Sequence, residues 1–245
     1  MGQQESVSFG IPELDRLLGG GLIPGNSYLL EVEPGTGELS FLAAFLKEGL
    51  RQKQYCAIIA VDYPHDYLIG RLSRIESEIG SAVASGSIVI VDLHQSGTYD
   101  PEHRSPVLMT ENPADPSSVT RLYLDMAHLG QSRIIEGEFV GSRSIICSLS
   151  SMIMNFKFEP AYKLARRAHE TVRDLGTTTL STLDPRMFPA NVVAAFERLY
   201  DGTIVLSMRD IDHKFQRFVR VKESPIAGFS LDEVPYSIVE GRPSL

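Results

Sequence analysis

Long apolar runs, cysteine and positive charge are all scarce in this chain of 245 residues. No run of about 18 apolar residues occurs, so we expect no helix that spans a membrane. The first residues carry no basic stretch followed by an apolar one, so we expect no secretory signal. The two cysteines, Cys56 and Cys147, lie inside apolar runs, which predicts buried thiols in a reducing compartment. Together these absences predict a cytoplasmic protein.

Basic residues are too few to favour sequence-independent binding to nucleic acid. The chain has 23 Lys and Arg against 31 Asp and Glu, a net charge of −8. Such binding draws its affinity from basic side chains at phosphates. A local basic stretch does occur, but acidic residues are interleaved with it, which favours a solvated helix face. Its members are Lys157, Lys163, Arg166 and Arg167.

Apolar runs typical of strands alternate with segments of helical periodicity. We expect strands at residues 27–32, 57–62, 87–93, 143–149, 177–183, 203–208, 215–222 and 237–240. We expect helices at residues 39–50, 68–79, 118–129, 160–175 and 190–200. The alternation predicts an α/β fold with a mostly parallel central sheet, helices on both faces and an antiparallel C-terminal edge.

Residues 1–245 are expected to form a single domain, interrupted by one excursion at residues 96–116. This segment carries four prolines and little periodicity, which is typical of a loop. The prolines are Pro101, Pro106, Pro113 and Pro116.

A glycine turn joins the first expected strand to the helix that follows it. The segment is Val32-Glu33-Pro34-Gly35-Thr36-Gly37-Glu38-Leu39-Ser40. A phosphate-binding loop of the pattern GxxxxGK(S/T) cradles phosphates with backbone N–H groups, neutralises them with its Lys and holds Mg²⁺ with its hydroxyl. In this chain Glu38 replaces the Lys and Leu39 replaces the hydroxyl residue. Ser40 comes one position late, about 100° away around the helix.

The reversed charge has a large expected effect on phosphate binding. A unit charge about 4 Å from a phosphate oxygen contributes roughly 4 kcal/mol at an effective dielectric near 20. Replacing Lys by Glu removes that attraction and adds a comparable repulsion, so affinity falls by two decades or more even after screening. We therefore expect residual binding at best from Pro34, Gly35, Thr36, Gly37, Glu38, Leu39 and Ser40. An ordinary glycine turn before a helix is the alternative interpretation.

Several motifs resemble the RecA superfamily, in particular its KaiC-like and archaeal RadA-paralog ATPases. The opening Phe9-Gly10-Ile11-Pro12-Glu13-Leu14-Asp15 and the later Leu18-Gly19-Gly20-Gly21-Leu22 are similar to the start of that family. Thr182-Leu183-Asp184-Pro185 and Phe218-Val219-Arg220-Val221-Lys222 resemble its late strand and terminal hairpin. The resemblance implies a RecA-like P-loop fold over nearly the whole chain.

The resemblance also implies where the family's ATPase residues would lie. The glutamates that polarise water correspond to Asp62 and Tyr63. The Walker B Asp that orients Mg²⁺ corresponds to Cys147. The basic residues offered to a neighbouring subunit correspond to the segment Glu223-Ser224-Pro225. With the phosphate-binding loop also altered, these departures imply a degenerate Walker A and Walker B, no catalytic or metal-binding residues, and neither ATP nor Mg²⁺ as a cofactor.

We therefore expect a catalytically inactive homologue that acts as a regulatory or protein-interaction subunit. Its partner would be another RecA/KaiC-like protein or a copy of itself. Two alternatives remain open: a nucleotide- or anion-binding sensor without hydrolysis, and a RadA-paralog-like accessory protein associated with DNA.

Three other groups of residues favour ordinary structural roles. Asp62, His65 and Asp66 could ligate a metal, but a polar turn and helix cap after a strand is the stronger interpretation. Asp210, Asp212 and His213 fall where a hairpin turn is expected. The apolar surroundings of Cys147 favour an inert thiol over a nucleophile.

Overall fold

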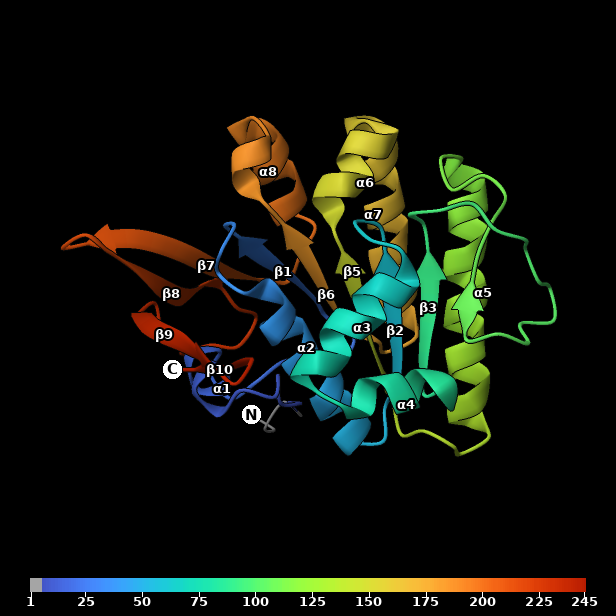
Figure 1. The fold of residues 1–245 in the computed structure, drawn as a ribbon, viewed down its shortest axis with the longest axis horizontal. Helices are drawn as coiled ribbons and strands as arrows, with labels where there is room; N and C mark the ends of the chain where they lie inside the picture. The colour runs from blue at the N-terminus through green and yellow to red at the C-terminus, as the bar shows by residue number, and fades with distance from the viewer. Residues whose placement is uncertain (1–5) are drawn as a thin grey trace.

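The computed structural model describes residues 6–245 and shows alternating strands and helices (Figure 1). Residues 1–5, on which the expectation about a secretory signal partly rests, lie outside the described part. The strands are β1 (Ser27–Val32), β2 (Tyr55–Ala60), β3 (Ile88–Asp92), β4 (Val107–Leu108), β5 (Ser142–Cys147), β6 (Thr178–Leu183), β7 (Gly202–Ile211), β8 (Lys214–Glu223), β9 (Glu233–Val239) and β10 (Arg242–Ser244). The helices are α1 (Pro12–Leu17), α2 (Glu38–Arg51), α3 (His65–Ile75), α4 (Glu78–Ala84), α5 (Pro116–Ile135), α6 (Leu149–Phe156), α7 (Phe158–Asp174) and α8 (Ala190–Glu197).

Within residues 6–245, ten strands form one sheet in the order β10-β9-β8-β7-β1-β6-β5-β2-β3-β4. The strands from β7 to β4 pair in parallel, whereas β8, β9 and β10 add an antiparallel edge. Strands β2, β3, β5 and β6 are buried along their whole length. Continuous apolar runs are typical of strands covered on both faces. The predicted mostly parallel α/β sheet with an antiparallel C-terminal edge is confirmed.

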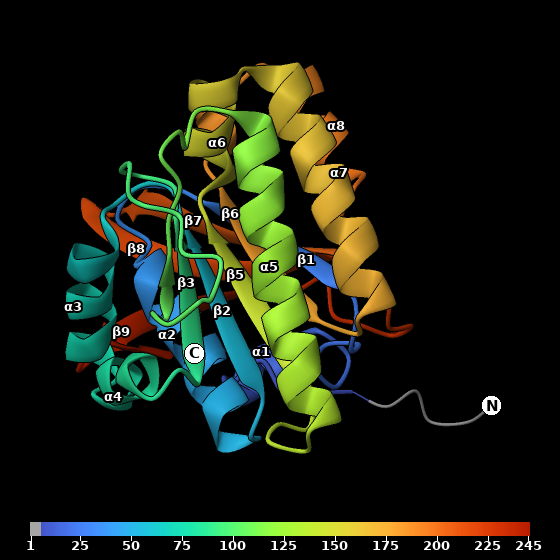
Figure 2. The same ribbon diagram turned by 90° about the vertical axis from the view of Figure 1, so that its right-hand side faces the viewer.

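Helices cover both faces of the sheet, as Figure 2 shows. On one face α1 to α4 pack over a core that includes Phe41, Phe45 and Ile58. On the other face α5 to α8 pack over a core that includes Ile59 and Phe196. Successive residues of a strand point to opposite faces, so Ile58 and Ile59 of β2 belong to different cores. No helix within residues 6–245 has the length and apolar character needed to cross a bilayer.

One predicted helix is wrong. Residues 68–79 were expected to form one helix, but α3 ends at Ile75 and a second helix, α4, begins at Glu78. The extended backbone of Glu76 separates them. The buried Glu76 carboxylate accepts hydrogen bonds from Lys47, at 2.8 Å, and from Arg242, at 2.7 and 3.0 Å. These distant partners stabilise a break that local spacing does not reveal.

Other boundaries also differ from the prediction. The expected strand at 143–149 ends at Cys147, because Ser148 accepts a hydrogen bond from the Ser151 N–H and caps α6. The expected last strand at 237–240 is two strands, β9 and β10, with a turn at Glu240 and Gly241, which both have positive φ. The segment 96–116 contains the short strand β4 and otherwise forms turns and irregular chain.

Candidate functional site

The carboxyl ends of β1, β2, β5 and β6 meet at one edge of the sheet, where α/β folds commonly bind ligands. A cleft of about 550 Å³ opens there. Four of the seven predicted loop residues line it: Pro34, Gly35, Gly37 and Glu38. Thr36, Leu39 and Ser40 are buried instead and do not line the cleft. The structure therefore divides the predicted site into a cleft-facing part and a core-facing part.

The turn between β1 and α2 has the backbone of a tight loop. Gly35 and Gly37 have φ of 89° and 80°, a region that strains other residues. The Thr36 hydroxyl donates a hydrogen bond to the Glu33 carbonyl at 2.6 Å, which closes the turn. Helix α2 begins at Glu38, so the N-terminal end of a helix lies at the cleft.

The C-terminal strands hold this loop from one side. The Met208 N–H of β7 donates to Glu33 Oε2 at 2.9 Å, Arg217 Nε of β8 donates to the Gly35 carbonyl at 2.8 Å, and the Tyr236 hydroxyl of β9 donates to the Thr36 carbonyl at 2.7 Å. Sequence analysis missed these contacts, because the partners lie 175, 182 and 200 residues away along the chain.

The strands also leave little room at the two glycines. A Cβ atom at Gly35 would lie 3.0 Å from Met208 Cε, and one at Gly37 would lie 3.2 Å from Ile238 Cγ1. Both positions therefore favour glycine through space as well as through φ.

Most of the charged side chains that line the cleft are acidic. Glu33, Glu38, Asp62 and Asp184 line it, whereas Arg71 is the one basic lining residue among residues 6–245. Asp184 forms an ion pair with Arg186, which lies two residues further on, at 3.1 Å. A phosphate group bound at the start of α2 would thus meet several carboxylates, an arrangement opposite to that of an anion site.

Two tyrosine rings beside the cleft contact the guanidinium of Arg71. The Arg71 guanidinium carbon lies 5.9 Å from the ring centroids of both Tyr63 and Tyr67. The two rings lie 5.2 Å apart between centroids. The guanidinium is therefore engaged at the rim of the cleft by cation–π contacts.

Asp62 and His65, considered above as metal ligands, point to different partners. Asp62 Oδ1 accepts hydrogen bonds from the N–H and hydroxyl of Ser148, at 3.1 and 2.8 Å. His65 Nδ1 lies 2.7 Å from Asp92 Oδ2. Within residues 6–245, no group of three or more His, Cys, Asp or Glu side chains is arranged to hold a metal ion.

The polar turn expected after β2 leads into α3, and Asp66 Oδ1 accepts the Tyr67 N–H in the first turn of that helix at 2.7 Å. Pro64 occupies the cap position, and Asp92, at the end of β3, accepts the His65 N–H at 3.1 Å. Burial raises the pKa of Asp92, but hydrogen bonds from His65, His94 and Gln95 outweigh it and lower the pKa below the ordinary value. The carboxylate therefore stays ionised and serves the helix terminus.

Cys147 lies at the end of β5, where the family resemblance places the Walker B acid. Its side chain is buried. Burial raises the pKa of the thiol well above its ordinary value, and the charges of Asp62 and Glu38 add to the effect. A thiol that stays protonated is a poor nucleophile and a poor metal ligand.

Two other predicted features lie away from the cleft. On α7, Lys163 pairs with Glu159 at 2.6 Å and Arg166 with Glu170 at 3.8 Å, as expected for a solvated helix face. Asp212 and His213 form the turn between β7 and β8, with φ of 51° and 61°, so the predicted hairpin turn is confirmed there. Asp210, predicted with them, lies in β7 instead and pairs with Phe215 of β8.

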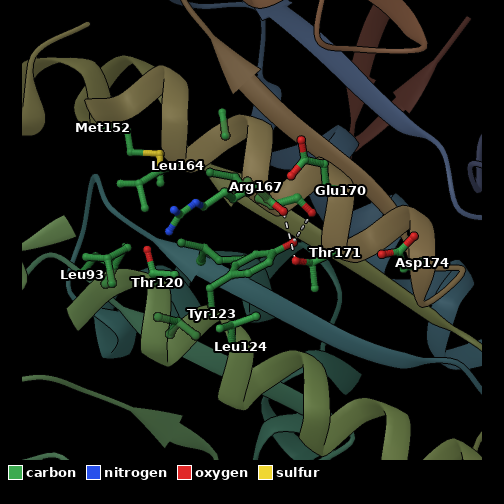
Figure 3. Close-up of a pocket in the computed structure, with 16 residues that line it drawn as sticks. Leu93, Thr120, Tyr123, Leu124, Met152, Leu164, Arg167, Glu170, Thr171 and Asp174 are labelled. Atoms are coloured by element: carbon green, nitrogen blue, oxygen red, sulfur yellow. Dashed lines mark hydrogen bonds between the residues drawn. The ribbon is translucent and has the colours of Figure 1, made fainter. Parts of the chain in front are cut away.

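A second cavity, of about 310 Å³, lies between α5 and α7 (Figure 3). Its walls are mainly apolar, and Arg167, Glu170 and Asp174 lie at its rim. No local pattern in the sequence indicates this cavity, because its lining comes from three strands and three helices.

Comparison with known proteins identifies relatives over nearly the whole chain. A family model described as "ATPase: KaiC" matches residues 7–242. No curated protein was found that matches the chain.

Two solved structures from Pyrococcus horikoshii share the fold. One is a KaiC-like protein of this hyperthermophilic archaeon, with 19% identity, a TM-score of 0.77 and coverage of 98% of this chain and 97% of that one. The other is an uncharacterized protein in complex with an unknown peptide, with 17% identity, a TM-score of 0.78 and coverage of 98% of both chains.

Proposed function

Because the chain belongs to the KaiC family of ATPases, we propose that it is a member that does not hydrolyse ATP and serves as a regulatory or protein-interaction subunit in the cytoplasm. The observation that carries this proposal is Glu38. It is the first residue of α2, it lines the strand-end cleft, and it stands where the family's loop has a Lys. Phosphoryl transfer consists largely of positioning and charge stabilisation, so this acid opposes the reaction at its centre.

The rest of the cleft supports the same proposal. ATP with Mg²⁺ does not fit the side chains present, because the position of the metal-holding hydroxyl is the buried Leu39 and that of the Walker B acid is the protonated Cys147. Of the two residues at the expected water-polarising position, Asp62 and Tyr63, only Asp62 is an acid, and its carboxylate accepts a hydrogen bond from the Ser148 hydroxyl. We derive no catalytic step from such a set.

If the protein does not hydrolyse ATP, an intact KaiC-like fold can still serve by binding another protein. The loop at the cleft is held by Arg217 and Tyr236, so its order does not depend on a bound phosphate. One structural neighbour was solved in complex with an unknown peptide, which is compatible with a protein-binding role. The partner we propose is another RecA/KaiC-like protein or a second copy of this chain.

Phosphate release from purified protein with ATP and Mg²⁺ tests the loss of activity. We expect no turnover above a blank. Turnover that is abolished by Glu38→Gln or Asp62→Asn, and retained by the control Glu159→Gln on the exposed face of α7, would overturn the proposal. Light scattering on a sizing column tests self-association, and a pull-down from source cells tests for a KaiC-like partner.

A sensor that binds a nucleotide or anion without hydrolysis is the second candidate. It is favoured by the N-terminus of α2 at the cleft and by Arg71 at the rim. Calorimetry with ATP, ADP, AMP and cyclic dinucleotides decides the question, because heat with any of them supports a sensor and silence with all of them removes it.

A DNA-associated accessory role has less support. Lys163 and Arg166, which would contact phosphates, are paired with acids of their own helix. A gel-shift assay at low salt tests this role, since electrostatic binding is strongest there.

A further inference from the structure

The cavity between α5 and α7 is deep and apolar at its base. Ile59 of β2, Val91 of β3 and Ile146 of β5 form its floor, and each is 2% exposed or less. Val119 of α5 and Leu164 of α7 belong to the side walls. Figure 3 shows the Tyr123 ring lying across the cavity from the side of α5.

The cavity opens at the surface, where Leu124 at its rim is 38% exposed, and it is larger than the gaps that ordinary side-chain packing leaves. An apolar cavity of about 150 Å³ stays dry and accepts benzene. The cavity here is about 310 Å³. It therefore has room for an apolar group of roughly ten carbon atoms.

The polar groups within the cavity are already engaged. The Tyr123 hydroxyl donates a hydrogen bond to the Ala168 carbonyl at 3.2 Å, and the Thr171 hydroxyl donates to the Arg167 carbonyl at 3.0 Å. Burial raises the pKa of Tyr123 above its ordinary value, so the phenol stays protonated and keeps its role as donor. The interior thus favours an apolar body over a polar one.

The rim offers a cation. In Figure 3 the Arg167 side chain extends from α7 over the cavity toward Thr120, whereas Glu170 and Asp174 lie toward the other end. Among residues 6–245, Lys163 and Arg166 of the same helix form ion pairs, but Arg167 forms none. A guanidinium beside an apolar cavity is suited to a carboxylate, which it can bind through two parallel hydrogen bonds.

We propose that this cavity binds a small amphipathic carboxylate of the size of a medium-chain fatty acid. The hydrocarbon lies between α5 and α7 against Ile59 and Ile146, and the carboxylate binds Arg167 at the rim. The inference does not rest on the proposed loss of ATPase activity, because the cavity shares no lining residue with the strand-end cleft.

Carbon-13 methyl NMR of the purified full chain tests the site. Decanoate, decanol and decylamine are titrated while the δ1 methyl signals of Ile59 and Ile146 are followed. We expect both signals to shift on addition of decanoate, to shift more weakly with decanol, and to shift least with decylamine. If none of the three shifts these signals, or if decylamine binds more tightly than decanoate, the proposal is wrong.

Substitutions at the rim distinguish binding of the ligand's carboxylate from burial of its hydrocarbon. Arg167→Gln should weaken decanoate binding roughly tenfold and leave decanol binding unchanged. Lys163→Gln is the matched control, since Lys163 lies on the same helix and neither it nor its partner Glu159 lines the cavity. Equal decanoate affinity in the Arg167→Gln and Lys163→Gln variants would overturn the role of Arg167.

A substitution that fills the cavity tests the location. Ala165 lines the wall, and Ala165→Leu should abolish binding of all three probes while the remaining methyl signals keep the pattern of a folded protein. Ala168→Leu, on the next turn of the same wall, serves the same purpose if the first variant does not fold. Undiminished decanoate binding in a folded filled variant would place the ligand elsewhere and contradict the proposal.

Discussion

The strand-end cleft and the cavity between α5 and α7 differ in how they could hold a ligand. The cleft, of about 550 Å³, has Glu33, Glu38, Asp62 and Asp184 in its lining, so we expect the charge of a ligand to decide whether it binds. The cavity, of about 310 Å³, is lined mainly by apolar side chains, so we expect the size of a ligand's apolar part to decide whether it binds. A single change of charge should therefore alter ligand binding most at the first site, whereas a change of side-chain volume should alter it most at the second.

The two sites also differ in how they are held together. Three hydrogen bonds from β7, β8 and β9 fix the loop at the cleft. The walls of the cavity are formed by α5 and α7, which pack against each other. A hydrogen bond from the Tyr123 hydroxyl of α5 to the Ala168 carbonyl of α7 links the two helices. We expect the cleft to change mainly with charge and the cavity mainly with side-chain volume.

The largest expected effect comes from restoring the charge at the cleft. Glu38→Lys combined with Leu39→Thr should raise ATP affinity by two to three decades, because an attraction of roughly 4 kcal/mol replaces a repulsion, halved by screening. Calorimetry measures the affinity. The same charge change at the exposed Glu159 is the control and should have no effect. If the double variant gains nothing, the remaining acids or the fixed loop exclude the nucleotide, rather than Glu38.

A buried carboxyl group of β1, Glu31, which lines neither the cleft nor the cavity, gives the next effect. Burial raises the pKa of Glu31 to about 7, and its neighbour Glu197 adds to this, while Lys222 opposes it with Nζ 3.6 Å from Glu31 Oε1. An acid with a raised pKa in the folded state contributes stability that is full below about pH 4.5 and is lost as the pH rises through 7. The free energy of unfolding should therefore fall by about 2 to 3 kcal/mol between pH 5 and pH 8.

Urea unfolding at both pH values measures this loss. Glu31→Gln should remove most of it and stabilise the protein at pH 8. The pKa of Glu197 is lowered although burial opposes this, so its own contribution is lost only at acidic pH, outside this window. An equally steep fall in the Glu31→Gln variant would show that another group titrates.

Substitution of two alanines of α7 compares the effect of added side-chain volume in the packed core and in the cavity. Ala161 is fully buried and does not line the cavity, so Ala161→Leu should cost about 1 to 3 kcal/mol by overpacking. Ala165→Leu places the same atoms in the cavity and should be neutral or stabilise by up to about 1 kcal/mol. Thermal and urea unfolding of both variants gives the difference. Equal losses would mean that the cavity is not available to a side chain at Ala165.

The smallest effect concerns the loop. Tyr236→Phe removes the hydrogen bond to the Thr36 carbonyl and should cost about 1 kcal/mol. It should also speed amide hydrogen exchange near Gly37, because one of the three contacts that fix the turn is lost. Tyr67→Phe, at a ring that is 52% exposed, is the control. If exchange is unchanged in Tyr236→Phe, the other two contacts suffice to fix the loop.

Sequence reasoning was most accurate where local pattern is strongest. The strand at residues 27–32 has the predicted bounds, because an apolar run buried on both faces leaves little ambiguity. The helix after the glycine turn was placed within one residue at each end. The break at Glu76 was missed, because the charges that stabilise it come from Lys47 and Arg242, far away in the sequence.

For the candidate site, the sequence by itself determined the chemical identity of each position: an acid at Glu38 and an apolar side chain at Leu39 after the glycine turn, and a thiol at Cys147 in an apolar run. Only the tertiary structure decided which of these side chains face the cleft, which distant strands hold the loop, and that a cavity opens between α5 and α7. The physical reason is the separation along the sequence of the residues that interact. Hydrogen bonding and apolar periodicity within a few residues set the helices and strands. Cavities and buried contacts depend instead on elements that are far apart in the sequence, such as those of Thr36 and Tyr236, which are 200 residues apart.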